Sequence, residues 1–223
     1  MNKIFIGFSR GTGISSWAIR LLTSFVKKRM QMKEDKVNVA FAPILLFLSF
    51  FGLTKYSKLN IRYNHCFLFY SSEDFNDFMV VDIIENGIVI QPAKIRLDKS
   101  TYTVLIESDL DIAKGVRYTS NYLGLRYDYK GVFGAALATF KFVFTGKEDK
   151  HIINSPERFL CSEYVTTVIN NSDEDFYIGE PMKTYPNLLC ELTKADKNFT
   201  TLIEKKNLTL DDIKFALKAT KQE

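Results

Sequence analysis

The sequence has few of the residues that form disulfides or bind zinc. Its three cysteines, Cys66, Cys161 and Cys190, cannot all pair, and it has only two histidines and no Cys-x-x-Cys motif. We therefore expect no disulfide framework, no metal site and no cofactor. The chain opens with a strand-like segment in place of a secretory signal, which favours a reducing, cytoplasmic location.

A strong excess of one charge is also missing. The 30 basic and 26 acidic residues give a net charge of +4, which is too mild to indicate a nucleic-acid partner. The charge is uneven, because residues 1–60 carry ten basic and two acidic side chains, and the remainder carries twenty and twenty-four. A chain of 223 residues with 46% hydrophobic residues can form a stable core without disulfide bonds or structural metal ions. We expect a single domain over 1–223, with an insertion at about 30–60 and a helical extension at about 180–223.

One long apolar run interrupts this ordinary composition. Residues 39–53 contain no charge, and Lys36, Lys55 and Lys58 flank them. The run is shorter than the roughly 20 residues of a membrane span, and Pro43 would interrupt its first turns. Two interpretations stay open. The run is either a buried core helix, or a lid or interfacial segment that contacts a partner or a membrane surface through Leu45, Leu46, Phe47 and Phe50.

Periodicity predicts both β-strands and α-helices along the chain. Asn86-Gly87 between two apolar runs indicates a hairpin. Thr209 is a suitable helix cap. The predicted strands are 3–8, 65–70, 78–84, 88–91 and 102–107, and the predicted helices lie within 14–29, 109–123, 131–144, 159–170 and 209–219.

Three side chains could carry nucleophilic chemistry. Cys161 opens a helix, where a thiol beside an imidazole has a lowered pKa. His65 enters a strongly apolar strand, whereas His151 follows a polar stretch and is expected in a solvated loop. Asp82, within an apolar strand, or Glu85 beside the turn, could orient the imidazole. A carboxylate buried at position 82 needs a partner or a wet cleft.

The order of these residues resembles the circularly permuted papain-like hydrolases, the YiiX-like branch of the NlpC superfamily, in which the histidine precedes the cysteine. The resemblance covers roughly residues 3–170 and includes the insertion before the histidine strand as a departure from the family. Its motifs are the Ser9-Arg10-Gly11-Thr12-Gly13 loop, Asn64-His65, an acid in the next strand, Tyr127-Asp128-Tyr129-x-Gly131 and Phe159-Leu160-Cys161-Ser162-Glu163-Tyr164-Val165.

The resemblance implies a permuted papain-like fold of the α+β class, an antiparallel sheet packed against helices. It also implies a cysteine hydrolase that cleaves an amide bond of a peptide or peptidoglycan-type substrate. Cys161 would be the nucleophile, His65 the base and then acid, and Tyr127 an oxyanion donor. Asp82 stands where the family commonly has the longer glutamate. The alternatives are a non-catalytic module that binds a membrane or an assembly, and an enzyme acting on acyl lipids, as the lecithin:retinol acyltransferase relatives do.

Overall fold

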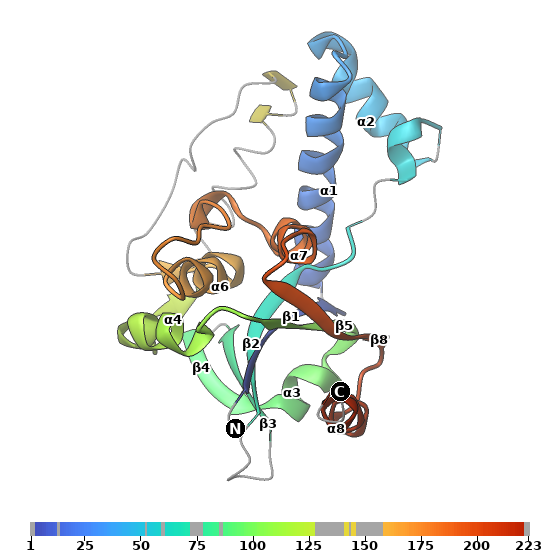
Figure 1. Ribbon diagram of the computed structural model, residues 1–223. Helices are drawn as coiled ribbons and strands as arrows, with labels where there is room; N and C mark the ends of the chain where they lie inside the picture. Colours follow the sequence, from blue (N-terminus) through green and yellow to red (C-terminus); the bar gives the residue numbers. More distant parts are fainter. Residues whose placement is uncertain are drawn as a thin grey trace.

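The computed structural model describes residues 3–12, 14–51, 53–58, 61–71, 78–84, 87–127, 141–142, 144–145 and 158–220. Within these residues the protein is an α+β structure with a six-stranded antiparallel sheet and seven α-helices (Figure 1). The order of the strands is β4-β3-β2-β1-β5-β8. Their bounds are β1 Lys3–Gly11, β2 His65–Ser71, β3 Phe78–Ile84, β4 Gly87–Pro92, β5 Ser100–Ser108 and β8 Phe199–Lys206.

Apolar side chains lie on both faces of the central strands, so each face carries its own core. Successive side chains of a strand point to opposite faces, and in β2 Cys66 and Leu68 face one core while Phe67 and Phe69 face the other. The first core is covered by α4 (Ile112–Tyr118), α6 (Cys161–Asn170) and α7 (Pro186–Ala195). The second is covered by α3 (Ala93–Asp98) and α8 (Leu210–Ala219).

A helical hairpin projects from this body (Figure 1). Helix α1 (Ile14–Glu34) extends away from the sheet, and α2 (Ala42–Phe50) packs against its far end, between the 3₁₀ turns η1 (Val39–Phe41) and η2 (Lys55–Lys58). A small separate core holds the hairpin together, formed by Met32, Ala42, Leu46 and Tyr56. In the described part of the chain, none of the helices combines the length and the apolar character that crossing a membrane requires.

Most of the predicted elements are confirmed. The strand 78–84 has the predicted bounds, and Thr209 caps α8 by accepting a hydrogen bond from the backbone N–H of Asp212. The helix expected at 131–144 lies largely outside the described residues. The prediction for 180–223 is wrong in one respect, because this segment contains β8, which pairs with β5 at the edge of the main sheet. As an edge strand, β8 is half exposed and polar, and its burial pattern does not alternate.

Candidate functional site

Cys161 is the first residue of α6 and lies against the sheet. The short strand β7 (Arg158–Phe159) leads into the helix, and the backbone N–H of Leu160 donates to the Glu163 carboxylate at 3.3 Å. This bond gives the N–H of the residue before the helix a partner and helps to fix the first turn. Cys161 itself is 4% exposed and packs with the core that α6 buries. The nucleophile candidate therefore sits at a helix N-terminus, where the helix dipole favours a negative charge.

His65 is the first residue of β2, and the residues before it are held in place on two sides. The side chain of Asn64 accepts a hydrogen bond from the Gly11 backbone N–H at 3.1 Å, which fastens the start of β2 to β1. The ring of His65 lies 6.4 Å from that of Phe67, two residues along the same face, in a stacked arrangement. These contacts restrict the orientation of the imidazole.

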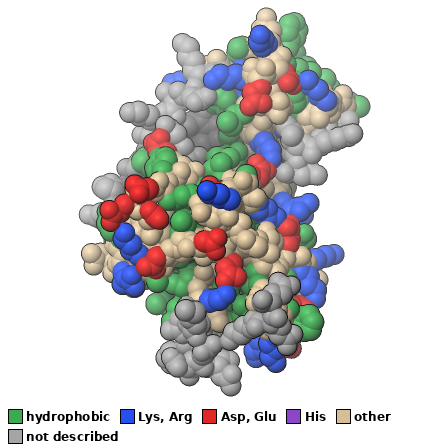
Figure 2. All heavy atoms as spheres, viewed as in Figure 1, with side chains coloured by type: hydrophobic (Ala, Val, Ile, Leu, Met, Phe, Trp, Pro, Cys, Tyr) green, Lys and Arg blue, Asp and Glu red, His purple; other side chains and the backbone are tan. Residues whose placement is uncertain are grey.

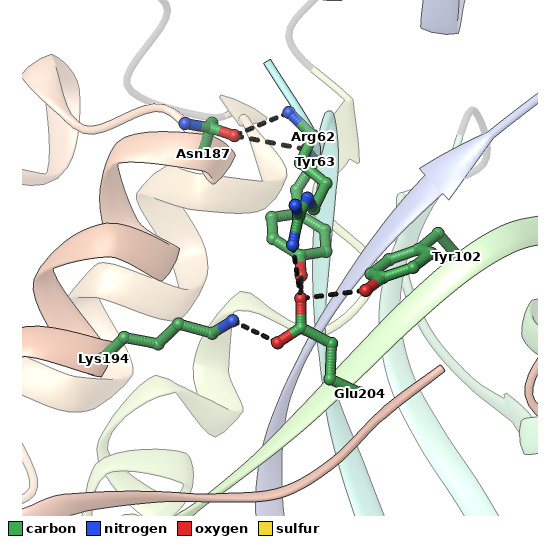
Figure 3. Close-up of polar contacts among 6 residues, drawn as sticks. All are labelled: Arg62, Tyr63, Tyr102, Asn187, Lys194 and Glu204. Atoms are coloured by element: carbon green, nitrogen blue, oxygen red, sulfur yellow. Dashed lines mark hydrogen bonds and ion pairs between the residues drawn. The ribbon is translucent and has the colours of Figure 1, made fainter. Parts of the chain in front are cut away.

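A polar cluster around Glu204 supports the same segment from the other side (Figure 3). The Asn187 side chain, on α7, accepts from the backbone N–H groups of Arg62 and Tyr63. Glu204, on β8, accepts from the Tyr63 hydroxyl at 2.6 Å. Lys194 and Arg62 pair with the same carboxylate at 2.6 and 2.9 Å. Helix α7 and strand β8 are thus tied to the segment that enters β2.

His65 and Asp82 are in direct contact. The Nε2 atom of His65 lies 2.6 Å from Oδ1 of Asp82, and the Asp82 side chain is completely buried. The ladder between β2 and β3 pairs Leu68–Ser71 of β2, so His65 lies beyond its end. Because Nε2 is engaged by Asp82, Nδ1 is the ring nitrogen left to share a proton with a nucleophile.

The second oxygen of Asp82 is held by two further side chains. Arg96, on α3, pairs with Oδ2 through Nε at 2.7 Å and also through Nη2. Gln91, on β4, donates its side-chain N–H to the same oxygen at 2.8 Å. These contacts are the partner that a carboxylate in an apolar strand requires. The Arg96 side chain is 11% exposed, so this ion pair is largely shielded from water.

Burial and the neighbouring charges shift the pKa values of both His65 and Asp82. Burial and the charge of Arg96 lower the pKa of His65, but the charges of Asp82 and Cys161 and the hydrogen bond to Asp82 raise it to about 9. Burial raises the pKa of Asp82, but His65 and Arg96 outweigh it, so the pKa falls below its usual value. At neutral pH the imidazole is therefore protonated and the carboxylate ionised.

Cys161 is acidic because two neighbouring groups stabilise its thiolate. A hydrogen bond from the Cys66 thiol lowers the pKa of Cys161, burial raises it, and the charge and hydrogen bond of His65 lower it further, to well below the ordinary value. Burial raises the pKa of Cys66 well above its ordinary value, so Cys66 acts as a neutral donor. The arrangement is an alternating series of charges, Arg96, Asp82, His65 and Cys161, that runs from α3 to α6.

The structure brings together the three residues Cys161, His65 and Asp82. Glu85 and His151 lie outside the described residues. The backbone of Tyr127, in β6 (Arg126–Tyr127), pairs with Phe159 in β7, two residues before Cys161, while its side chain is outside the described part.

The apolar run divides between the two predicted environments. Leu46 is buried and packs against α1, so the prediction that it contacts a partner or a membrane is wrong. Leu45 is half-buried. Phe47 is 63% exposed, as the interfacial interpretation requires. The side chain of Phe50 lies outside the described residues.

Sequence reasoning missed Arg96, Gln91 and Cys66. The buried acid at position 82 was a signal that a cationic partner exists, but α3 was not predicted and several basic residues were available. Cys66 adjoins His65 in sequence, and a strand sends adjacent side chains to opposite faces. Its contact with Cys161 depends on where α6 packs.

Neither a metal centre nor a known relative explains this cluster. In the parts of the chain that the structure describes, no three histidine, cysteine or acidic side chains are grouped so that they could hold a metal ion. Comparison with protein-family models and with curated proteins finds no match for this chain. The function is therefore argued from the geometry of the site.

Proposed function

We propose that this protein is a cysteine hydrolase of the permuted papain-like type that cleaves an amide bond. One observation carries the proposal: the contact series from Asp82 through His65 to Cys161 combines a buried acid, an imidazole and an acidic thiol. Each group has a role that its environment fits. Asp82 orients the ring, His65 holds and transfers the proton, and Cys161 supplies the sulfur.

The reaction follows from these protonation states. The Cys161 thiolate attacks the amide carbonyl carbon, and protonated His65 gives its proton to the departing nitrogen, so the C–N bond breaks and a thioester remains. Neutral His65 then takes a proton from water, whose oxygen attacks the thioester. The C–S bond breaks, the product leaves as a carboxylic acid, and the Cys161 thiolate and His65 imidazolium are restored.

The charge on the tetrahedral oxygen needs donors beside the sulfur. The first N–H groups of a helix have no partners within the helix, and the Cys161 N–H is one of them. Tyr127 is the proposed second donor, because its strand lies next to β7, which leads to the nucleophile. Together they would form the oxyanion hole.

We propose a peptide or peptidoglycan-type amide as the substrate, following the family that the motifs resemble. A non-catalytic module is the weaker alternative, because burying Asp82 and its partners costs stability that well-packed apolar side chains would not. An acyltransferase acting on lipids would use the same nucleophile. The products separate the two enzymes, because a hydrolase gives a free acid and a transferase gives a new ester or amide.

The test is turnover on a panel of peptides and peptidoglycan-derived stem peptides, with mass spectrometry of the enzyme during reaction. We expect an acyl group attached to Cys161 and release of amine and acid products. Cys161→Ser and His65→Ala should each reduce kcat by about 10³-fold or more.

Cys190→Ser is the matched control, because burial raises the pKa of this cysteine to about 12 and it lies outside the charge series. It should retain turnover. Undiminished turnover in Cys161→Ser, or a thiol adduct that forms at Cys190 in preference to Cys161, would refute the proposal.

A further inference from the structure

The hairpin of α1 and α2 carries an apolar surface that the proposed hydrolase chemistry does not use. Helix α2 buries Ala42 and Leu46 against α1 and Tyr56, so one of its sides is accounted for by the small hairpin core. The other side faces solvent. Large apolar side chains of this side and of the segments that flank α2 are each 43–69% exposed. They are Val39, Phe41, Ile44, Phe47, Phe51 and Leu53.

These side chains form a concentrated patch. Six of the fourteen large apolar side chains that are exposed in the described part of the chain lie within residues 39–53. The rings of Phe47 and Phe51, one helical turn apart, are 5.2 Å from centroid to centroid. Clustered exposed apolar residues mark a contact surface, whereas isolated ones do not. The patch sits at the far end of the projecting hairpin, where a flat surface can reach it (Figure 1).

Basic residues flank the patch on both sides in the sequence. No charged residue lies within 39–53, while Lys33 and Lys36 precede it and Lys55 follows it, all of them exposed. Apolar and basic side chains lie at this end of the molecule, together with acidic ones (top of Figure 2). Two acids, Glu34 and Asp35, lie between Lys33 and Lys36 in the sequence. Asp35 is engaged within the hairpin, by Lys55 at 2.7 Å and by the Tyr56 hydroxyl at 2.9 Å, and Glu34 accepts a hydrogen bond from Gln31 at 3.0 Å.

The charge of the hairpin distinguishes two possible partners for the patch, a second copy of the chain and an anionic lipid surface. A second copy of the chain would bring another basic hairpin toward this one, since residues 14–58 carry eight basic and two acidic side chains. An anionic lipid surface complements the charge and also accepts the apolar side chains. Helix α2 has nine residues and is about 13 Å long, so it can lie within the interface but cannot cross a hydrocarbon core of roughly 30 Å.

We propose that the exposed face of α2 is a membrane-docking surface that inserts into the interface of an anionic bilayer. Phe47, Phe51 and their neighbours enter the boundary between headgroups and acyl chains, and Lys33, Lys36 and Lys55 face the lipid headgroups. Docking is independent of Cys161, so it holds whether or not the protein hydrolyses amides.

Vesicle flotation with the full chain tests the proposal. We expect the protein to float with vesicles of phosphatidylcholine and phosphatidylglycerol, and at least 10-fold less with phosphatidylcholine alone. The double variant Phe47→Asp, Phe51→Asp should lose at least 10-fold in binding to the anionic vesicles. Lys33→Glu with Lys36→Glu should weaken binding severalfold and flatten its dependence on salt.

The matched control is Phe215→Asp with Tyr177→Asp, which adds the same charge at exposed aromatic positions outside the hairpin. This control should float like the unmodified chain. Three results would each overturn the proposal: no flotation with anionic vesicles, equal flotation of the Phe47→Asp, Phe51→Asp variant, or a dimer in light scattering that this variant dissociates while vesicles do not bind.

Discussion

At the scale of single residues, the site depends on how four neighbouring side chains, largely shielded from water, stabilise one another's charged states. Arg96 neutralises Asp82, Asp82 supports a proton on His65, and protonated His65 stabilises the Cys161 thiolate. The ordinary thiol pKa is about 8.5, so the unassisted cysteine would be almost entirely protonated at pH 6. The neighbours of Cys161 therefore determine its reactivity.

We predict a bell-shaped dependence of kcat/KM on pH. Activity should rise at low pH as Cys161 loses its proton, and it should fall as the pH passes about 9, where His65 loses the proton that the leaving group needs. Iodoacetamide should alkylate Cys161 rapidly at pH 6. In His65→Ala the rate at pH 6 should drop on the order of 100-fold, because the thiol pKa returns toward its ordinary value. Equal alkylation rates in the two proteins would contradict the ion pair.

Arg96 is predicted to be a positioning residue. In Arg96→Gln, Asp82 loses one of its two charged partners and the His65 ring is less well oriented, so kcat should fall on the order of 10–100-fold with KM little changed. The positive charge of Arg96 lowers the pKa of His65, so the alkaline limb of the pH profile should move above pH 9 in the variant. Lys94→Gln, on the same helix but 69% exposed and paired with Asp98, is the control and should leave both quantities unchanged.

At the scale of elements, the position of the nucleophile depends on how closely α6 is packed. Gly115 of α4 lies against α6 so closely that an added Cβ would meet the carbonyl oxygen of Val168 at 2.0 Å and the Ser172 hydroxyl at 2.7 Å. A backbone oxygen cannot move aside without shifting its helix. Glycine therefore permits the contact between α4 and α6 that fixes α6 against the sheet.

Gly115→Ala should push α4 away from α6. We expect a loss of about 1–3 kcal/mol in the free energy of unfolding, measured with urea, and a decrease in kcat from displacement of Cys161. Lys114→Ala, which removes only a surface ion pair with Glu174, should change stability by less than about 1 kcal/mol. If Gly115→Ala has the stability of the unmodified protein, the helices are not packed as described.

At the scale of the whole molecule, Glu204 links parts of the chain that are far apart in sequence (Figure 3). Its carboxylate joins β8 to Lys194 of α7, Tyr102 of β5 and Tyr63 before β2. Burial raises the pKa of Glu204, but the hydrogen bonds of Lys194 and Tyr63 and the nearby positive charges lower it to about 2. A depressed folded-state pKa stabilises the fold above the unfolded value of about 4.3.

Glu204→Ala should reduce stability by about 2 kcal/mol at pH 7. The difference from the unmodified protein should shrink as the pH falls from about 4 to about 2, because the carboxylate then gains its proton in the folded state as well. Glu174→Ala, at an 89% exposed side chain, should show neither effect. Thermal unfolding across this pH range measures the difference, and a constant gap between the two curves would contradict the assigned role.

Local patterns in the sequence determined most of the elements and the three candidate site residues. Short continuous apolar runs define β2 and β3, and the position of Cys161 at the start of an amphipathic segment marks a helix N-terminus, because these features depend on neighbours within a few residues. A buried acid at position 82 already required a partner.

The tertiary structure alone decided which residues are neighbours across the chain. Arg96, Gln91 and Cys66 reach the site because α3, β4 and α6 pack around β2 and β3, and no local period encodes that packing. It also placed β8 at the edge of the sheet, and it buried Leu46 while leaving Phe47 exposed. Helix α2 is apolar on every side, so only the position of α1 determines which side meets water.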